Sequence, residues 1–203
     1  MISHSLLYLN VMSFGSLMTV FLTRNGVDEY DIGVAQGVAS IIGFFGVTAF
    51  PLLDKWIGLQ KAATCAIWYF VLTCGLGMSF VLGKHPEVWG FTVCIICSRC
   101  GLWVFDLCTR QIVQERVEES ARNRSNGHWN SMISGFDMTS FALAIVISGD
   151  NQFRQLCVVS FCFLLLSALN FSVYNSTSQK AVCDVDKDGF SADAAGMRSK
   201  IEE

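Results

Sequence analysis

The sequence predicts an all-α membrane protein, and three observations carry that prediction. Of its 203 residues, 52% are apolar and only 15% are charged, whereas about 25% of the residues of an average soluble domain are charged. The mean hydropathy is +0.46. The charged residues cluster in short gaps between long apolar runs. Runs of this kind are typical of helices that cross a bilayer, each of which needs roughly 20 mostly apolar residues.

Six apolar segments are long enough to cross a membrane as helices, and they cover residues 6–22, 32–51, 62–82, 88–108, 130–148 and 156–174. The fifth segment is the least hydrophobic, so we expect its polar side chains to face the bundle interior or a wet cavity. Residues 1–174 are therefore predicted to form the transmembrane domain. The polar, charged residues 175–203 are predicted to form a disordered cytoplasmic tail.

The distribution of cations predicts the orientation in the membrane. If the N-terminus is cytoplasmic, the outer loops hold only Arg24, Lys84 and Arg154, and Arg99 lies inside a span. The other ten of the 14 Lys and Arg residues then lie inside. Because cytoplasmic loops carry the excess of Lys and Arg, both termini are predicted to be cytoplasmic. The net charge of −3 gives no reason to expect nucleic acid as a partner.

Glycines and one polar stretch indicate how the helices are arranged. Gly33 and Gly37 form a G-x-x-x-G pair, and Gly43 and Gly46 follow. Such glycines let helix backbones approach closely in lipid, although a membrane helix also tolerates glycine with no packing role. Residues 111–129 are predicted to form a helix on the cytoplasmic side, with a turn at Asn126-Gly127 before the fifth span.

Ionisable groups inside a membrane span are costly and mark functional positions. Arg99 lies near the middle of the fourth span, Asp106 lies seven residues further on roughly the same helix face, and Asp137 lies in the fifth span. In a structural interpretation, Arg99 pairs with one of the two carboxylates and holds two helices together. In a functional interpretation, these residues belong to a gate or a cation path, with Asp137 as the candidate for binding a metal ion or a proton.

The nine cysteines favour neither a disulfide framework nor a metal centre. Seven of them lie inside apolar runs, where reduced thiols pack as small hydrophobic groups. Cys94, Cys97 and Cys100 fall at helical spacing, but the only charged neighbour on those turns is Arg99, which disfavours a metal. No nucleophile–base pair, phosphate loop or metalloprotease motif is present, so we expect no enzyme and no cofactor.

Two segments resemble a known transporter family. Residues 99–107, with the sequence RCGLWVFDL, resemble the R-x-G-L-W-x-F-D-L run of the ferroportins, solute carrier family 40. The similarity continues in register from Gln111 to Asp137. Residues 8–19, YLNVMSFGSLMT, resemble the seventh helix of the family and are most like the plant-type members. The resemblance covers roughly residues 6–174.

The resemblance implies a major-facilitator fold in which this chain is the six-helix C-terminal lobe and lacks the N-terminal lobe. It implies export of iron(II) or a similar divalent metal by alternating access. The expected partners are the lipid bilayer, the transported metal ion, and an N-terminal lobe or a second copy. Arg99, Asp106 and Asp137 match charged residues of the family, and the first two are the candidates for gating or ion pairing.

Three positions depart from the family pattern. Gly15 and Ser16 stand where vertebrate members have an Asp-Cys pair, and Ser140 stands where they have a histidine. The resemblance implies that those side chains form the metal site of the C-terminal lobe and, through the cysteine, the hepcidin contact. Glycine and serine are poor ligands for iron(II). A hepcidin contact is therefore not expected, and a strong metal site would lie mainly in the N-terminal lobe.

Two alternatives remain open at the level of the sequence. The chain could be a non-transporting half-lobe or a regulatory membrane fragment. It could also be part of a related carrier for another cation or an organic solute, since the metal-ligand positions are lost. The sequence predicts a multi-pass protein in the plasma membrane or an organellar membrane, without distinguishing the two.

Overall fold

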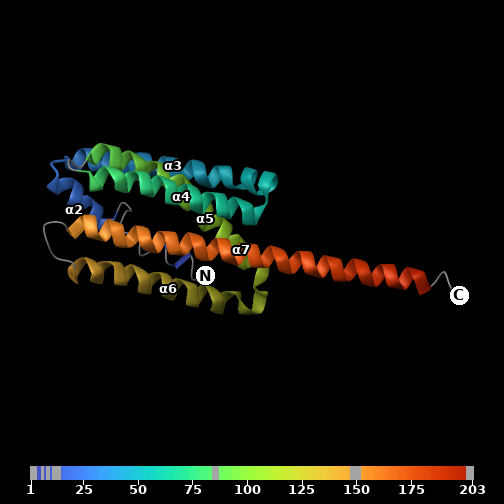
Figure 1. Ribbon diagram of the computed structural model, residues 1–203. Coiled ribbons are helices and arrows are strands. Elements are labelled where there is room, and N and C mark those ends of the chain that lie inside the picture. Colours follow the sequence, from blue (N-terminus) through green and yellow to red (C-terminus); the bar gives the residue numbers. More distant parts are fainter. Residues whose placement is uncertain are drawn as a thin grey trace.

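The computed structural model describes residues 4–5, 7, 10, 15–83, 87–146 and 152–199. This part of the chain contains one short helix, α2 (Ser16–Arg24), and five long ones (Figure 1): α3 (Glu29–Ile57), α4 (Leu59–Leu82), α5 (Val88–Arg116), α6 (Glu119–Val146) and α7 (Gln152–Ser199). Successive helices from α3 to α7 run in alternating directions along one common axis. The predicted all-α class is confirmed.

Four helical segments are long and apolar enough to cross a membrane, namely Glu29–Ile57, Leu59–Leu82, Val88–Arg116 and Phe153–Thr177. The predicted spans 32–51, 62–82, 88–108 and 156–174 each lie inside one of them. The predicted span 130–148 lies mostly within α6, which does not reach the same apolarity because of its many polar residues. Much of the predicted span 6–22 lies outside the described residues, and α2 covers its end.

The turn between α5 and α6 lies earlier than the sequence predicts. Helix α5 ends at Arg116, Val117 adopts an extended conformation, and α6 begins at Glu119. The predicted turn at Asn126-Gly127 is wrong, because α6 runs through both residues without a break. An acidic residue in the first turn of a helix is stabilised by the helix dipole, and Glu119 supplies one here.

The centre of the bundle is α5, which packs mainly against α4 and α3, while α7 packs against α4. Two glycines allow the close approach. A Cβ on Gly101 would lie 2.9 Å from the carbonyl oxygen of Ala66 in α4, and a Cβ on Gly46 would lie 2.8 Å from that of Cys100 in α5. The expected close packing at Gly33 and Gly37 is not seen, because no described atom lies within 4 Å of either Cβ position.

A single residue joins α3 to α4. Helix α3 ends at Ile57, α4 begins at Leu59, and Gly58 between them has φ of 81° and ψ of 151°. This conformation favours glycine, because a side chain is strained at positive φ. The amide of Gly58 donates to the carbonyl of Asp54 at 2.9 Å, which ends α3 with a satisfied hydrogen bond.

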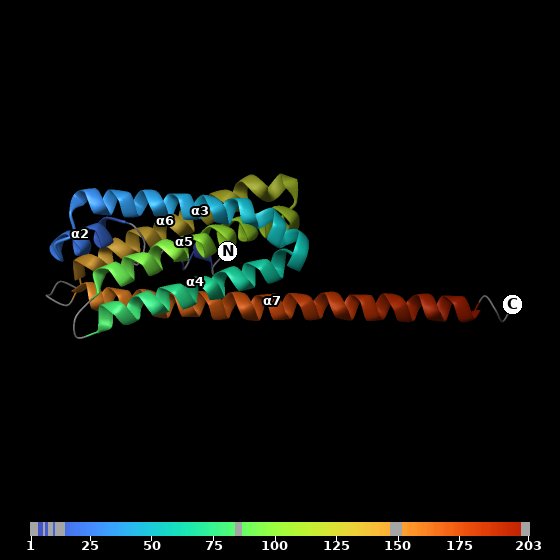
Figure 2. The same ribbon diagram turned by 90° about the horizontal axis from the view of Figure 1, so that it is seen from above.

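Helix α7 continues well beyond the bundle, as two perpendicular views show (Figures 1 and 2). It extends to Ser199, whereas the sequence predicts disorder from residue 175. Proline breaks a helix, and no proline follows Pro86 in the sequence, so no proline interrupts α7. The division into a domain of residues 1–174 and a tail of residues 175–203 stays a prediction.

Candidate functional site

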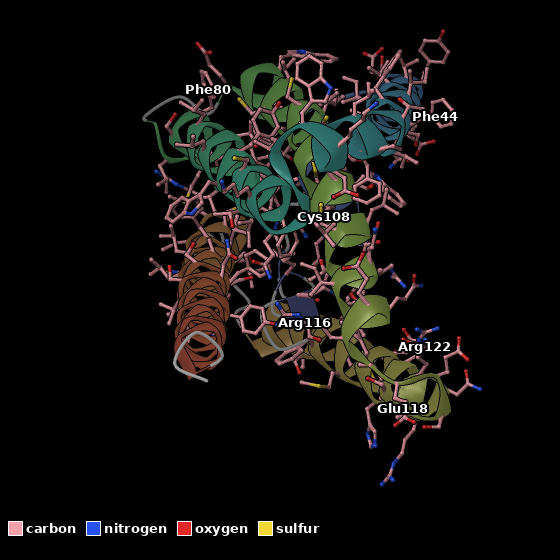
Figure 3. The ribbon with its side chains drawn as sticks, turned by 90° about the vertical axis from the view of Figure 1, so that its right-hand side faces the viewer. Phe44, Phe80, Cys108, Arg116, Glu118 and Arg122 are labelled. Carbon is pink, nitrogen blue, oxygen red and sulfur yellow. The ribbon has the colours of Figure 1, made fainter. Side chains whose placement is uncertain are left out.

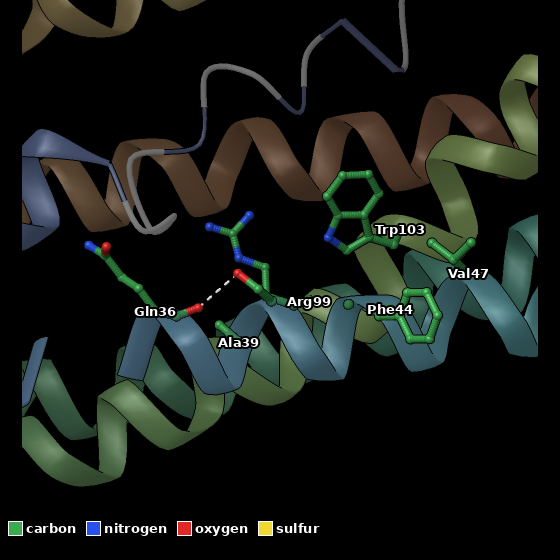
Figure 4. Close-up of a pocket in the computed structure, with 8 residues that line it drawn as sticks. Gln36, Ala39, Phe44, Val47, Arg99 and Trp103 are labelled. Atoms are coloured by element: carbon green, nitrogen blue, oxygen red, sulfur yellow. Dashed lines mark hydrogen bonds between the residues drawn. The ribbon is translucent and has the colours of Figure 1, made fainter. Parts of the chain in front are cut away.

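A pocket of about 450 Å³ lies between α3 and α5. Figure 4 shows the side chains of Gln36, Arg99 and Trp103 directed to the same side of α3. The lining consists of one face of α3 and two residues of α5, namely Gln36, Ala39, Ser40, Gly43, Phe44, Val47, Arg99 and Trp103. Both helices that line the pocket, α3 and α5, are long and apolar enough to span a membrane.

Helical spacing and one glycine shape this pocket. Arg99 and Trp103 are four residues apart on α5, so their side chains lie one turn apart on one face. Gly43 on α3 makes room for the indole: a Cβ at this position would lie 2.6 Å from Cδ1 and 2.6 Å from Nε1 of Trp103. Any larger residue at position 43 would therefore displace the indole.

Among the described lining residues, the polar groups are mostly hydrogen-bond donors. The guanidinium of Arg99 has five N–H groups, Gln36 has an amide NH₂, and the indole of Trp103 has one N–H. The hydroxyl of Ser40 donates to the carbonyl of Gln36 at 2.9 Å (Figure 4). No carboxylate, imidazole or thiol is among the described residues that line this pocket.

A second cluster joins the N-terminal segment to α5 and α6. The Nε2 atom of His4 lies 2.6 Å from Oδ1 of Asp106, and Nε of Arg110 donates to Oδ2 at 2.9 Å. The indole Nε1 of Trp129 donates to Nδ1 of His4 at 3.1 Å. The guanidinium carbon of Arg110 lies 5.5 Å from the centre of the Trp129 ring. We call these four residues the His4 cluster.

Hydrogen bonding in this cluster determines which nitrogen of His4 carries the proton. The indole of Trp129 can only donate, so Nδ1 of His4 must accept. A neutral imidazole then carries its proton on Nε2 and donates it to the carboxylate of Asp106. His4 and Trp129 are 1% and 3% exposed, so loss of either bond would leave a buried polar group without its partner.

Arg99 and Asp106 both lie on α5, but they contact different described residues. Asp106 pairs with Arg110 and His4 among the described residues, not with Arg99, which lies in the pocket between α3 and α5. Asp137 is exposed on α6. No local pattern in the sequence points to His4, because its carboxylate partner lies 102 residues away.

The positions that depart from the family pattern do not form a metal site with described neighbours. Gly15 is exposed and precedes α2, Ser16 begins that helix, and the buried hydroxyl of Ser140 donates to the carbonyl of Asp137 at 2.7 Å. Within the described part of the chain, no three His, Cys, Asp or Glu residues are grouped so that they could hold a metal ion. The cysteines with described side chains have free thiols.

Charged side chains of α5 and α6 make contacts at one end of the bundle. Figure 3 looks onto this end, where Arg116 lies between α5 and α7, while Glu118 and Arg122 lie at the outer corner between α5 and α6. Arg116 donates to the hydroxyl of Tyr174 and stacks over its ring at 5.4 Å. Nε of Arg122 donates to the carbonyl of Val117 at 3.1 Å and fastens the turn between the helices.

Comparison with known proteins adds independent findings. A family model described as Ferroportin1 (FPN1) matches residues 1–164. The chain is 30% identical over 185 residues to solute carrier family 40 member 1 of Oryza sativa subsp. japonica, covering 89% of this chain and 38% of the relative. It is 29% identical to solute carrier family 40 member 1 of Arabidopsis thaliana, covering 85% of this chain and 33% of that relative.

The fold is also that of a solved structure. A bacterial homologue of the iron transporter ferroportin, crystallised in an inward-facing state, superimposes with a TM-score of 0.80 at 24% sequence identity. The alignment covers 86% of this chain and 44% of the bacterial chain. The chain thus spans less than half the length of the relatives and of the solved structure that it matches.

The apolar helices, the helix arrangement and the structural match define a multi-pass membrane protein with a major-facilitator-type transporter fold. The matched family model extends over most of the chain. The chain belongs to the ferroportin family, solute carrier family 40, so the family that the sequence predicts is confirmed.

Proposed function

We propose that this chain is the C-terminal lobe of an exporter of iron(II) or a similar divalent metal, and not an enzyme. The match of the ferroportin family model to residues 1–164 is the observation that carries the proposal. The superposition on the bacterial ferroportin homologue supports it. Because a transporter of this fold binds its substrate between two repeats, transport would require this lobe to face an N-terminal lobe or a second copy.

The metal would obtain few ligands from this lobe. Gly15, Ser16 and Ser140 offer no imidazole, thiolate or carboxylate, and iron(II) favours imidazole and carboxylate ligands. Asp137 is the candidate metal-binding carboxylate, and its exposure on α6 leaves it accessible to an ion. We infer that most of the ligands belong to the facing lobe. For the same reason, hepcidin is not proposed as a partner.

Arg99 and Asp106 are proposed as gating residues with different roles. Asp106 connects α5 to the N-terminal segment through His4, so the His4 cluster would hold one end of the lobe closed. Arg99 lies in the pocket between α3 and α5, where it would face the translocation path. A polar or charged residue inside a span commonly marks such a path.

We also propose that both termini are cytoplasmic. Lys55, Lys61, Arg110 and Arg116 all lie near the ends of α3, α4 and α5 that Figure 1 shows at one side of the bundle. Arg24 lies at the end of α2, on the opposite side. The excess of cations on the first side supports its assignment to the cytoplasm. The host membrane would be the plasma membrane or that of an organelle.

A carrier for another cation or an organic solute is the second candidate, because the metal-ligand positions are occupied by Gly15, Ser16 and Ser140. A chimera tests the metal-export proposal. The part of the rice relative that this chain matches is replaced by residues 1–174, and efflux of radioactive Fe²⁺ and Co²⁺ is measured in cells. Metal efflux above that of cells without the chimera supports the exporter. A chimera that reaches the membrane and moves neither metal contradicts it.

A further inference from the structure

The pocket between α3 and α5 has the chemistry of an anion site, not of a metal site. Its positive group is Arg99, and its other polar groups include the donors Gln36 and Trp103. A guanidinium cannot ligate a cation, because it has no acceptor and stays protonated. The absence of carboxylate, imidazole and thiol from the described lining residues points in the same direction.

The size and the apolar wall of the pocket indicate an organic anion. Its volume of about 450 Å³ lies within the range of about 300–1,000 Å³ that is common for small-molecule sites. Ala39, Phe44 and Val47 contribute apolar surface on α3. An inorganic ion such as chloride or phosphate would leave this surface without a contact, whereas the carbon skeleton of a small acid would cover it.

The geometry of the donors matches a carboxylate. A guanidinium binds the two oxygens of a carboxylate through two parallel N–H bonds. The indole of Trp103 lies one helical turn away on α5, and its Cδ1–Nε1 edge lies against Gly43. Ser40 donates to the carbonyl of Gln36, and the oxygen of its hydroxyl can still accept a hydrogen bond.

We propose that the pocket formed by Gln36, Ser40, Arg99 and Trp103 binds a small organic carboxylate. The carboxylate contacts Arg99, the N–H of Trp103 supports one of its oxygens, and Gln36 and Ser40 contact polar substituents on its carbon chain. This proposal does not require that the chain transports metal, because it concerns binding to the lobe itself.

The test measures binding of radioactive malate to the purified chain in detergent micelles. We expect saturable binding by the unaltered chain. Arg99→Gln should weaken it by about tenfold or more, because it removes a charged hydrogen-bonding partner. Trp103→Phe, which loses the N–H and keeps the ring, should weaken it by a smaller factor. Arg124→Gln, which removes an exposed cation of α6, is the matched control and should bind like the unaltered chain.

A further variant distinguishes a loss of binding from a loss of folding. Arg99→Lys keeps the charge inside the span but loses the two-pronged geometry, and it should bind malate more weakly than the unaltered chain and more tightly than Arg99→Gln. The proposal is overturned if malate, succinate and citrate all fail to bind the unaltered chain. It is equally overturned if Arg99→Gln binds malate with unchanged affinity, or if phosphate displaces malate as effectively as succinate does.

The result is independent of the metal-export test. A chimera that fails to export Fe²⁺ and Co²⁺ leaves malate binding to the chain unaffected. Conversely, a chain that binds no carboxylate can still supply the C-terminal lobe of a functional exporter. The two proposals therefore fail separately.

Discussion

The imidazole of His4 and the carboxylate of Asp106 lie 2.6 Å apart although 102 residues separate them in the chain. This contact fastens the N-terminal segment to α5, and the bond from Trp129 to His4 extends it to α6. Asp106 also accepts from Arg110 on its second oxygen. Three separate parts of the chain therefore meet at one buried histidine.

His4→Ala is expected to lower the free energy of unfolding by about 1–3 kcal/mol, because it leaves the buried N–H of Trp129 without an acceptor. The measurement is denaturant unfolding of the purified chain in detergent, followed by tryptophan fluorescence. His128→Ala is the control, since His128 is exposed on α6. Equal stability of the two variants would contradict a structural role for His4.

The tautomer of His4 is a separate prediction. Nitrogen-15 NMR of histidine-labelled protein at pH 8 should show a neutral ring protonated at Nε2, because Trp129 donates to Nδ1. The signal is assigned by its loss in His4→Gln. In Trp129→Phe the constraint on Nδ1 disappears, and a mixture of tautomers is expected. A majority of Nδ1–H tautomer in the unaltered chain would refute this hydrogen-bond arrangement.

Glycine substitutions on α3 should separate packed positions from open ones. Gly46→Ala places a methyl group 2.8 Å from the carbonyl oxygen of Cys100, and such overpacking costs about 1–3 kcal/mol. Gly37→Ala meets no described atom within 4 Å and should be neutral or stabilising by up to about 1 kcal/mol. The thermal midpoints of both variants test this, and a Gly37→Ala variant as unstable as Gly46→Ala would contradict the packing of α3 against α5.

Cysteine labelling tests the orientation. Asn25→Cys lies between α2 and α3, and Lys55→Cys lies near the other end of α3; both positions are exposed. In intact cells with the protein at the surface, a membrane-impermeant maleimide should label Asn25→Cys above the unaltered chain. Lys55→Cys should gain label only after permeabilisation. The reverse pattern would place the termini outside.

The role of Asp137 can be measured in the chimera with the rice relative. Asp137→Asn is expected to reduce metal efflux, because it removes the charge that would attract a divalent ion while it keeps the size of the side chain. Glu118→Gln, at the exposed turn between α5 and α6, is the control for a change in charge. Efflux that is equal in both variants would remove Asp137 from the candidate site.

The middle of the fold could be predicted from sequence because hydrophobic length is a local property. The segments 32–51, 62–82 and 88–108 each lie within one apolar helix of the structure. The predicted turn at Asn126-Gly127 is wrong, because this dipeptide favours a turn only where the neighbouring residues do not continue the helix. In the structure, Glu119 starts a helix that continues through it.

The candidate site was predictable only in part, because burial and pairing depend on distant residues. Arg99 was found as a charge inside an apolar segment, but its place beside Gln36 depends on how α3 packs against α5. The partners of Asp106 could not be inferred from spacing, since His4 comes from the N-terminal segment. Likewise, Gly33 and Gly46 look alike in sequence, and only the helix register distinguishes the open position from the packed one.

The one-residue connection at Gly58 has a mechanical consequence. Two helices joined by a single residue cannot slide past one another by a helical turn, because the linker is too short to span the added distance. α5 packs against both of them, so α3, α4 and α5 should behave as one stiff block. When a transporter built from this lobe changes its access from one side of the membrane to the other, α3, α4 and α5 would then tilt together as a rigid body. The pocket beside Arg99 would move with them and keep its shape.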